Sequence, residues 1–145
     1  MIDNHPHSKL QAIWKIILIR FIQNKDIMYN KNNIFAKIIT GEIPATKLYE
    51  DEVLIAIKDI NPAAPIHILV IPKGNYINFA DFVKKAPSDH INHYFKTIAK
   101  IAKDNGANEY RTVSNNGLSS GQSVFHFHTH ILSGSKNINL IDKNL

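Results

Sequence analysis

The stretch "FHFHTHIL", Phe125–Leu132, places three histidines at alternate positions near the end of a 145-residue chain. Side chains of a β-strand point alternately to its two faces, so an extended chain puts His126, His128 and His130 on one face. The residues between them then face the core. We therefore expect a strand over residues 124–132 that is anchored by one face and presents imidazoles on the other.

The residues before these histidines add groups that suit a phosphate. Gly121 allows a ligand to approach the backbone closely, and Gln122 and Ser123 supply polar donors. Free N–H groups in such a loop can line an anion pocket. Imidazoles, a hydroxyl and backbone N–H groups together can hold a phosphate and attack its phosphorus.

Two other interpretations of the histidines are open. They could be structural residues, or two of them at positions i and i+2 could converge on Zn²⁺. A zinc site usually needs a third ligand and carboxylates around it, yet no Asp or Glu lies between Glu109 and Asp142. The chain has no cysteine, which excludes disulfides and thiolate metal sites. Nucleophilic catalysis at phosphorus is the preferred interpretation, with no metal and no cofactor.

The composition is that of an ordinary globular protein, with 44% apolar and 20% charged residues. This length suits one domain with a buried core. The formal net charge of +5 is not gathered into a Lys/Arg run, so we expect no nucleic-acid partner.

Residues 10–22, "LQAIWKIILIRFI", are much more apolar than the rest of the chain. Lys15 and Arg20 interrupt them, and they are too few to span a bilayer. No small-residue cleavage site follows, which argues against a signal peptide. An interfacial amphipathic helix is one alternative. We favour a domain over residues 28–145, with residues 1–27 as an extension upstream of the native start. We expect a cytoplasmic protein without membrane contact unless that extension is native.

The rest of the chain predicts an α+β fold on a mostly antiparallel five-stranded sheet with two helices. Asn32 or Asn33 caps a short helix that Gly41 and Pro44 end. A longer helix begins near Ser88 as its N-cap and ends at Gly106. Strands are expected at "TKLYED" (46–51), "VLIAIKD" (53–59), "IHILVIP" (66–72, central), "EYRTVSN" (109–115) and residues 124–132.

"HFHTHIL" resembles the histidine triad motif, His-φ-His-φ-His-φ-φ, where φ is apolar. The similarity extends over about residues 33–134, to the Hint-like branch of the histidine triad (HIT) family. It includes "NIFAKIITGEIPATKLYEDEVLIAIKDINPAAPIHILVIPK" and "SNNGLSSGQSVFHFHTHILSG". This resemblance implies a homodimer whose two sheets join across the interface. Members bind purine nucleoside monophosphates and hydrolyse bonds at the α-phosphate, typically cleaving adenosine phosphoramidates to AMP and an amine. Dinucleoside polyphosphate hydrolysis, or a nucleotide-binding or interaction role with vestigial activity, are the alternatives.

Matching positions imply a role for each histidine. His128 would be the nucleophile that forms a nucleotidyl-histidine intermediate. His126 would orient it, His130 would contact the phosphate, and His67 would lie behind the triad. Ser123 is included with these catalytic residues.

The resemblance also implies a nucleotide site. Asp59 would hold ribose hydroxyls and Ile60 would pack on the base. The remaining expected contacts are Ile34, Phe35 and Ile38 for the base, with Asn115, Gly121, Gln122 and Ser123 for the phosphate and leaving group. Three departures from the family pattern bear on substrate choice: Ile57 replaces an aromatic ring, Thr129 takes an apolar position, and "SGS" follows "HIL" where "GGR" is common.

Overall fold

The computed structural model describes residues 6–23 and 28–134. Five strands form one antiparallel sheet in the order β1-β2-β3-β5-β4, with β3 at its centre as expected. The strands are β1 (Lys47–Glu50), β2 (Leu54–Lys58), β3 (Ile66–Pro72), β4 (Tyr110–Val113) and β5 (Thr129–Ser133). The α+β class and the antiparallel sheet are confirmed.

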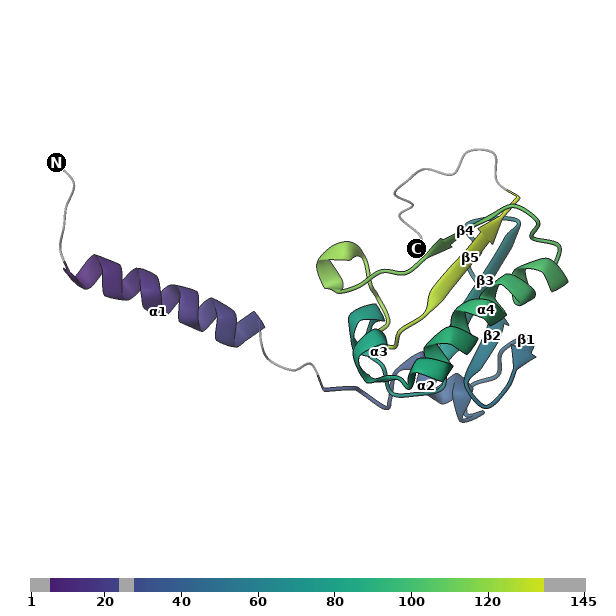
Figure 1. Cartoon of the computed structure of the whole chain (residues 1–145), viewed down its shortest axis with the longest axis horizontal. Coiled ribbons are helices and arrows are strands. Elements are labelled where there is room, and N and C mark those ends of the chain that lie inside the picture. Colours follow the sequence, from purple (N-terminus) through teal and green to yellow (C-terminus); the bar gives the residue numbers. More distant parts are fainter. Residues whose placement is uncertain (1–5, 24–27, 135–145) are drawn as a thin grey trace.

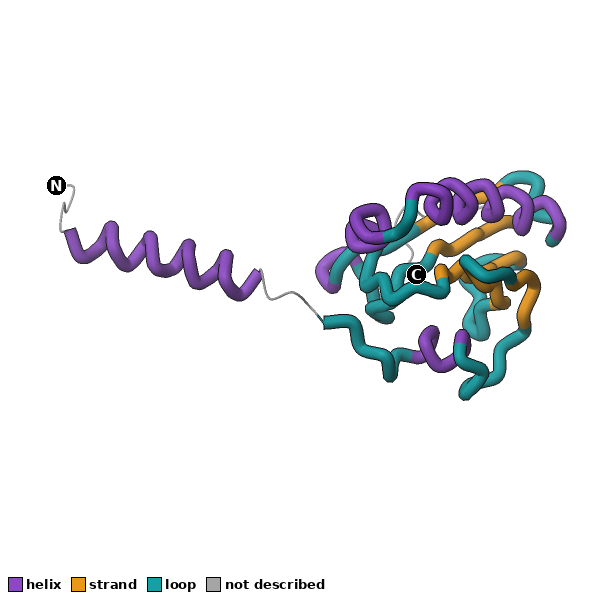
Figure 2. Tube along the Cα trace, turned by 60° about the horizontal axis from the view of Figure 1, so that its bottom comes forward, coloured by secondary structure: helices purple, strands orange, loops and turns teal. Residues whose placement is uncertain are grey.

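Helices cover both faces of this sheet. Figures 1 and 2 show α3 (Phe79–Lys85) and α4 (Ser88–Asp104) on one face and α2 (Ile34–Ile39) on the other. A short 3-10 turn, Leu118–Ser120, lies in the loop before the histidines. The described residues 28–134 thus hold one α-helix more than the two that were predicted, because α3 was not expected.

Before the domain lies α1 (Pro6–Gln23), which stands apart from the sheet in Figure 1. Ile13, Trp14, Ile16, Ile17 and Leu18 are all exposed. Together with the exposed Leu10, four of them (Ile13, Trp14, Ile17 and Leu18) follow the i, i+3, i+4, i+7, i+8 spacing of one apolar helix face. An interfacial amphipathic helix therefore stays a prediction for α1. No described helix is long and apolar enough to cross a membrane.

Alternation along the strands divides the core in two. Toward α3 and α4, side chains such as Ile68 and Val70 pack around Phe82 and Tyr94. Toward α2, Leu69 and Ile71 of the same strand pack around Phe35 and Ile38 of α2. Phe127 and Ile131 belong to the first cluster, so the histidines between them face α2. The predicted division of this segment into a core face and an imidazole face holds.

The strand itself is shorter than predicted. Strand β5 begins at Thr129, so only His130 lies within it, and His126 and His128 precede it. Pairing on one side ends at Val70–Thr129, shortly before Pro72, whose nitrogen has no hydrogen to donate to a ladder. On the other side β4 ends at Val113, opposite His130. Before Thr129 the histidine segment therefore has no neighbouring strand to pair with.

The ends of the helices agree with the sequence in two places and differ in one. Asn33 caps α2 by accepting a hydrogen bond from the Ala36 N–H at 3.0 Å. Gly106, just after α4, has a φ of +79°, the left-handed conformation that favours glycine at such a stop. Ser88, however, is the first residue of α4 rather than its cap, and Pro87 precedes it without a side-chain bond.

Candidate active site

A cavity of about 300 Å³ lies on the α2 side of the sheet and collects most of the predicted site. His128 and His130 line it together with Ser123. Its other lining residues that the sequence predicted are Ile34, Phe35, Asp59 and Ile60. Segments from α2, the loop after β2 and the triad therefore meet at one place, as a site for one small ligand would require.

The two ring nitrogens of His128 have different surroundings. The Nδ1 atom lies 2.7 Å from the carbonyl oxygen of His126, so Nδ1 carries the proton and donates it. In a neutral ring the Nε2 lone pair is then available. Burial lowers the pKa of His128 below its ordinary 6.5, although the bond to the His126 carbonyl and the charge of Asp59 partly oppose this. His128 is therefore a neutral imidazole whose orientation is set by the hydrogen bond from Nδ1 to the His126 carbonyl.

The ring of Phe35 fixes the other side of this imidazole. It meets the His128 ring edge-on, with centroids 4.8 Å apart. Phe35 therefore both lines the cavity and limits the rotation of the His128 ring.

His67 and His130 form a hydrogen-bonded pair behind the cavity. The Ala63 N–H donates to His67 Nδ1 at 2.9 Å, so the His67 proton is on Nε2. That atom lies 2.9 Å from His130 Nδ1 and donates to it. His130 must then carry its own proton on Nε2, which is buried without a hydrogen-bond partner among the described residues. A buried N–H of this kind can be satisfied by a ligand oxygen.

His130 stays neutral in this setting. Burial, followed by the nearby His128 and His67, lowers its pKa to about 3. The N–H on Nε2 is therefore a neutral hydrogen-bond donor near pH 7, not a charged one.

His126 does not line the cavity, and its buried ring is held on both sides. Its Nε2 donates to the Pro72 carbonyl oxygen at 2.7 Å, and its Nδ1 accepts from the Tyr29 hydroxyl. Burial lowers its pKa to about 4. The backbone carbonyl of His126 is what contacts His128, so the predicted orienting role is consistent with the geometry. Tyr29 was not predicted, since no motif marks it.

Asp59 reaches the same group of histidines. One carboxylate oxygen lies 3.4 Å from His67 Nε2, and the other accepts the Asn61 N–H at 2.8 Å. The next residue, Ile60, is 88% exposed at the cavity edge, an unusual place for a large apolar side chain unless a ligand covers it. A carboxylate is therefore near the triad, although the residues around the motif offered none.

Four of the expected nucleotide contacts do not line the cavity. Ile38 is buried in the core under α2. Gln122 is 2% exposed; its amide nitrogen donates to the carbonyls of Ile77 and Val124, and its oxygen accepts the Gly117 N–H. Gln122 therefore holds the loop in shape. Asn115 and Gly121 lie in the same loop, where Gly121 has a φ of +87°. Direct contacts by these four stay predictions.

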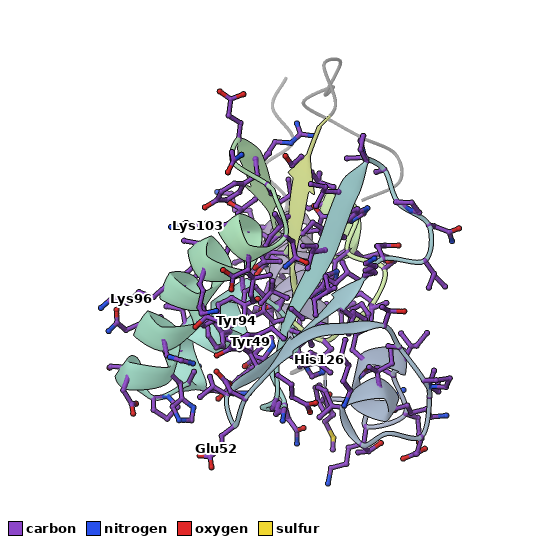
Figure 3. All side chains as sticks on the ribbon, turned by 90° about the vertical axis from the view of Figure 1, so that its right-hand side faces the viewer. Tyr49, Glu52, Tyr94, Lys96, Lys103 and His126 are labelled. Carbon is purple, nitrogen blue, oxygen red and sulfur yellow. The ribbon has the colours of Figure 1, made fainter. Side chains whose placement is uncertain are left out.

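Thr129 also fits its position. Its hydroxyl is buried on the α4 side, 3.1 Å from the Tyr94 hydroxyl and 3.0 Å from that of Ser114. Figure 3 shows Tyr94 on this side and His126 toward α2. Because the hydroxyl is satisfied, threonine can replace the apolar residue without disturbing the triad.

Asp59, His67 and His130 place potential metal ligands within 4.8 Å of one another. A metal on His67 Nε2 would force the His67 proton onto Nδ1, where it would face the Ala63 N–H. Two donors would then point at each other, and the hydrogen bond to His130 would be lost. The donor set as arranged fits a chain of hydrogen bonds between neutral rings and does not fit a metal.

Known proteins share much of this sequence. The HIT domain family matches residues 40–137. The chain belongs to the HIT family. A HIT-like protein of Rickettsia prowazekii is 53% identical over 119 residues, which cover 81% of this chain and 99% of the relative. A 14 kDa zinc-binding protein of Zea mays is 48% identical over 105 residues, covering 70% of this chain and 80% of the relative.

A solved structure extends the likeness to the fold. A HIT family hydrolase from Clostridium thermocellum matches with a TM-score of 0.67 and 42% identity, covering 77% of this chain and 99% of that one. The predicted HIT fold and the resemblance to the HIT family are thus confirmed, whereas the Hint-like branch stays a prediction.

Proposed function

We propose that this HIT protein is a nucleotide hydrolase that acts at the α-phosphate of purine nucleoside phosphoramidates and releases AMP and an amine. The observation that supports this most is the protonation pattern of the two cavity histidines. His128 offers a bare Nε2 and His130 offers an Nε2–H, a nucleophile beside a donor. The solved structure from Clostridium thermocellum that resembles this chain is that of a HIT family hydrolase, which is in keeping with the proposal.

In the first step the Nε2 lone pair of His128 forms a bond to the α-phosphorus, and the phosphorus–nitrogen bond to the amine breaks. The His130 N–H donates a hydrogen bond to a phosphoryl oxygen as negative charge develops there. The leaving nitrogen takes up a proton and departs as the amine; the Ser123 hydroxyl at the cavity edge is our candidate to deliver it. Water then attacks the phosphorus and gives one proton back to the Ser123 oxygen; the bond from phosphorus to His128 Nε2 breaks, which releases AMP and restores both residues.

The other residues that line the cavity suit the ribose and the base of a nucleoside. We assign Asp59 to the ribose hydroxyls and the apolar side chains of Ile34, Phe35 and Ile60 to the base. Ile57, which also lines the cavity, replaces an aromatic ring by a smaller apolar surface. An aliphatic side chain at this position stacks less strongly on a base than an aromatic ring would, so the site should distinguish purines from pyrimidines less sharply. We therefore expect a mild purine preference.

Turnover of an adenosine phosphoramidate tests this proposal. We expect AMP release by the wild type and a loss of at least about a thousandfold in kcat for His128→Gly, because the covalent route is removed. His90→Ala, on α4 and outside the cavity, is the control and should keep full activity. Tight AMP binding without turnover would favour a binding protein instead. Faster cleavage of a dinucleoside polyphosphate would favour that alternative.

We also propose a homodimer, from the resemblance. The outer strand β4 leaves one edge of the sheet unpaired within the described chain, beside a cavity of about 420 Å³. Phe79, Phe95 and Tyr110 at this cavity are large and exposed. Sedimentation should give twice the 16.4 kDa chain mass; a monomer at micromolar concentration would refute the dimer.

A further inference from the structure

Tyr29 lies before the matched family region and beside the triad. Its hydroxyl is 2.5 Å from His126 Nδ1, across 97 positions of sequence. The two rings also meet edge-on, with centroids 5.5 Å apart. Neither the triad motif nor the matched segment, which begins at residue 40, assigns any role to this tyrosine.

The hydrogen bond fixes one tautomer of His126. Since Nε2 donates to the Pro72 carbonyl, Nδ1 has only its lone pair to offer, and the Tyr29 hydroxyl is its donor. The ring is 1% exposed, so water cannot readily replace that donor. The ring of His126 is thereby tied at both ends.

The same residue aims the nucleophile. The backbone carbonyl of His126 accepts the Nδ1–H of His128, so a shift of His126 moves the acceptor that orients the His128 ring. Phe35, six positions after Tyr29, contacts both rings edge-on, with centroids 6.3 Å from His126 and 4.8 Å from His128. One short segment, residues 29–35, thus contacts both histidines.

We propose that Tyr29 is a positioning residue that acts through His126 on the orientation of the nucleophilic His128. The inference rests on the proposed function, and it adds a residue that touches neither the substrate cavity nor the reacting atoms. Tyr29 itself does not line the cavity. Its removal should therefore affect the chemical step more than substrate binding.

Tyr29→Phe is the direct test, because it removes one oxygen and keeps the ring. We expect kcat to fall about tenfold or more with KM changed less than about twofold, as for other residues that orient an active group through hydrogen bonds. Tyr76→Phe is the matched control. Its ring packs on Phe82 on the α4 side, and its hydroxyl makes no hydrogen bond within the described part of the chain. Tyr76→Phe should retain the wild-type kcat.

Nitrogen NMR of the histidine rings supplies a second readout that needs no turnover. In the wild type, His126 should be an Nε2–H tautomer and His128 an Nδ1–H tautomer. In Tyr29→Phe both tautomers should persist, because the Pro72 and His126 carbonyls still accept these protons. The His126 Nδ1 signal should shift because it loses its Tyr29 donor, and the His128 Nδ1 signal should shift with its displaced acceptor. Unchanged kcat with unchanged ring-nitrogen shifts of His126 and His128 would overturn the proposal. A loss of activity that merely follows the unfolded fraction, or equal changes in kcat and KM, would overturn it too.

Failure of the proposed function gives a different result. If the wild type does not turn over any phosphoramidate, the function fails. The ring-nitrogen shifts of His126 and His128 in the wild type and in Tyr29→Phe then still decide whether Tyr29 positions the pair.

Discussion

At the scale of single residues, the site depends on where each proton lies. One chain of hydrogen bonds runs from the Ala63 N–H to His67 and from His67 to His130. The ring of His126 is fixed separately, by the Tyr29 hydroxyl and the Pro72 carbonyl. The sequence could predict the three histidines and, through the resemblance, His67. It could not predict their tautomers, because those depend on backbone groups such as the Ala63 N–H that any residue could supply.

The pH dependence of turnover follows from the surroundings of His128. Its imidazole attacks only when neutral, and burial lowers its pKa below 6.5. The neutral form therefore persists as the pH falls through 6.5, and the acid limb of kcat/KM should have its midpoint below that value. His126 and His130, with pKa values of about 4 and 3, protonate only in more acidic solution.

A pH–rate profile from pH 4 to pH 8 provides the measurement. It should use a substrate that does not titrate in this range. A midpoint at or above 6.5 would contradict the buried, neutral nucleophile.

At the scale of elements, the bounds of helices and strands could be predicted where the apolar periodicity was clear, but not for short segments. The continuous apolar run of β3 and the spaced apolar residues of α4 were recognised with nearly correct bounds. Helix α3 has seven residues, too few to establish a helical period, and only its cap, Asn78, marked it. The start of β5 depends on where its neighbours end, which the local sequence of β5 does not contain.

The turn between β1 and β2 offers a test of one element contact. Asp51 accepts the N–H groups of Val53 and Leu54 at 2.8 and 2.9 Å. Its other oxygen accepts the Tyr49 hydroxyl at 2.8 Å and lies 2.6 Å from His93 of α4. One carboxylate thus closes the turn and ties it to the helix.

Asp51→Ala should lower the free energy of unfolding by about 2 kcal/mol, since several polar groups lose their partner. Glu52→Ala is the matched control at the next position, an exposed side chain at the turn in Figure 3. Its effect should stay within about 0.5 kcal/mol. Urea denaturation of both variants gives the comparison, and equal losses would show that the carboxylate does not hold the turn.

At the scale of the whole molecule, one face of the sheet packs into the core under α4 and the other carries the candidate active site. Phe127 and Ile131 anchor the histidine segment in the core under α4. The imidazoles between them face α2, where the cavity lies. The alternating pattern of "FHFHTHIL" predicted this division. It could not predict that residues 29–35 would cover the imidazole side, because their contacts with the triad span more than 90 positions.

The central claim is that His128 makes a transient covalent bond to phosphorus. Quenching the wild-type protein during turnover of a slow adenosine phosphoramidate, followed by intact-mass and peptide analysis, tests it most directly. We expect an added adenylyl mass (AMP minus one water) localised to His128 and absent from His128→Gly. Steady release of AMP with no adduct at His128, under conditions that stabilise phosphorus–nitrogen bonds, would contradict the account.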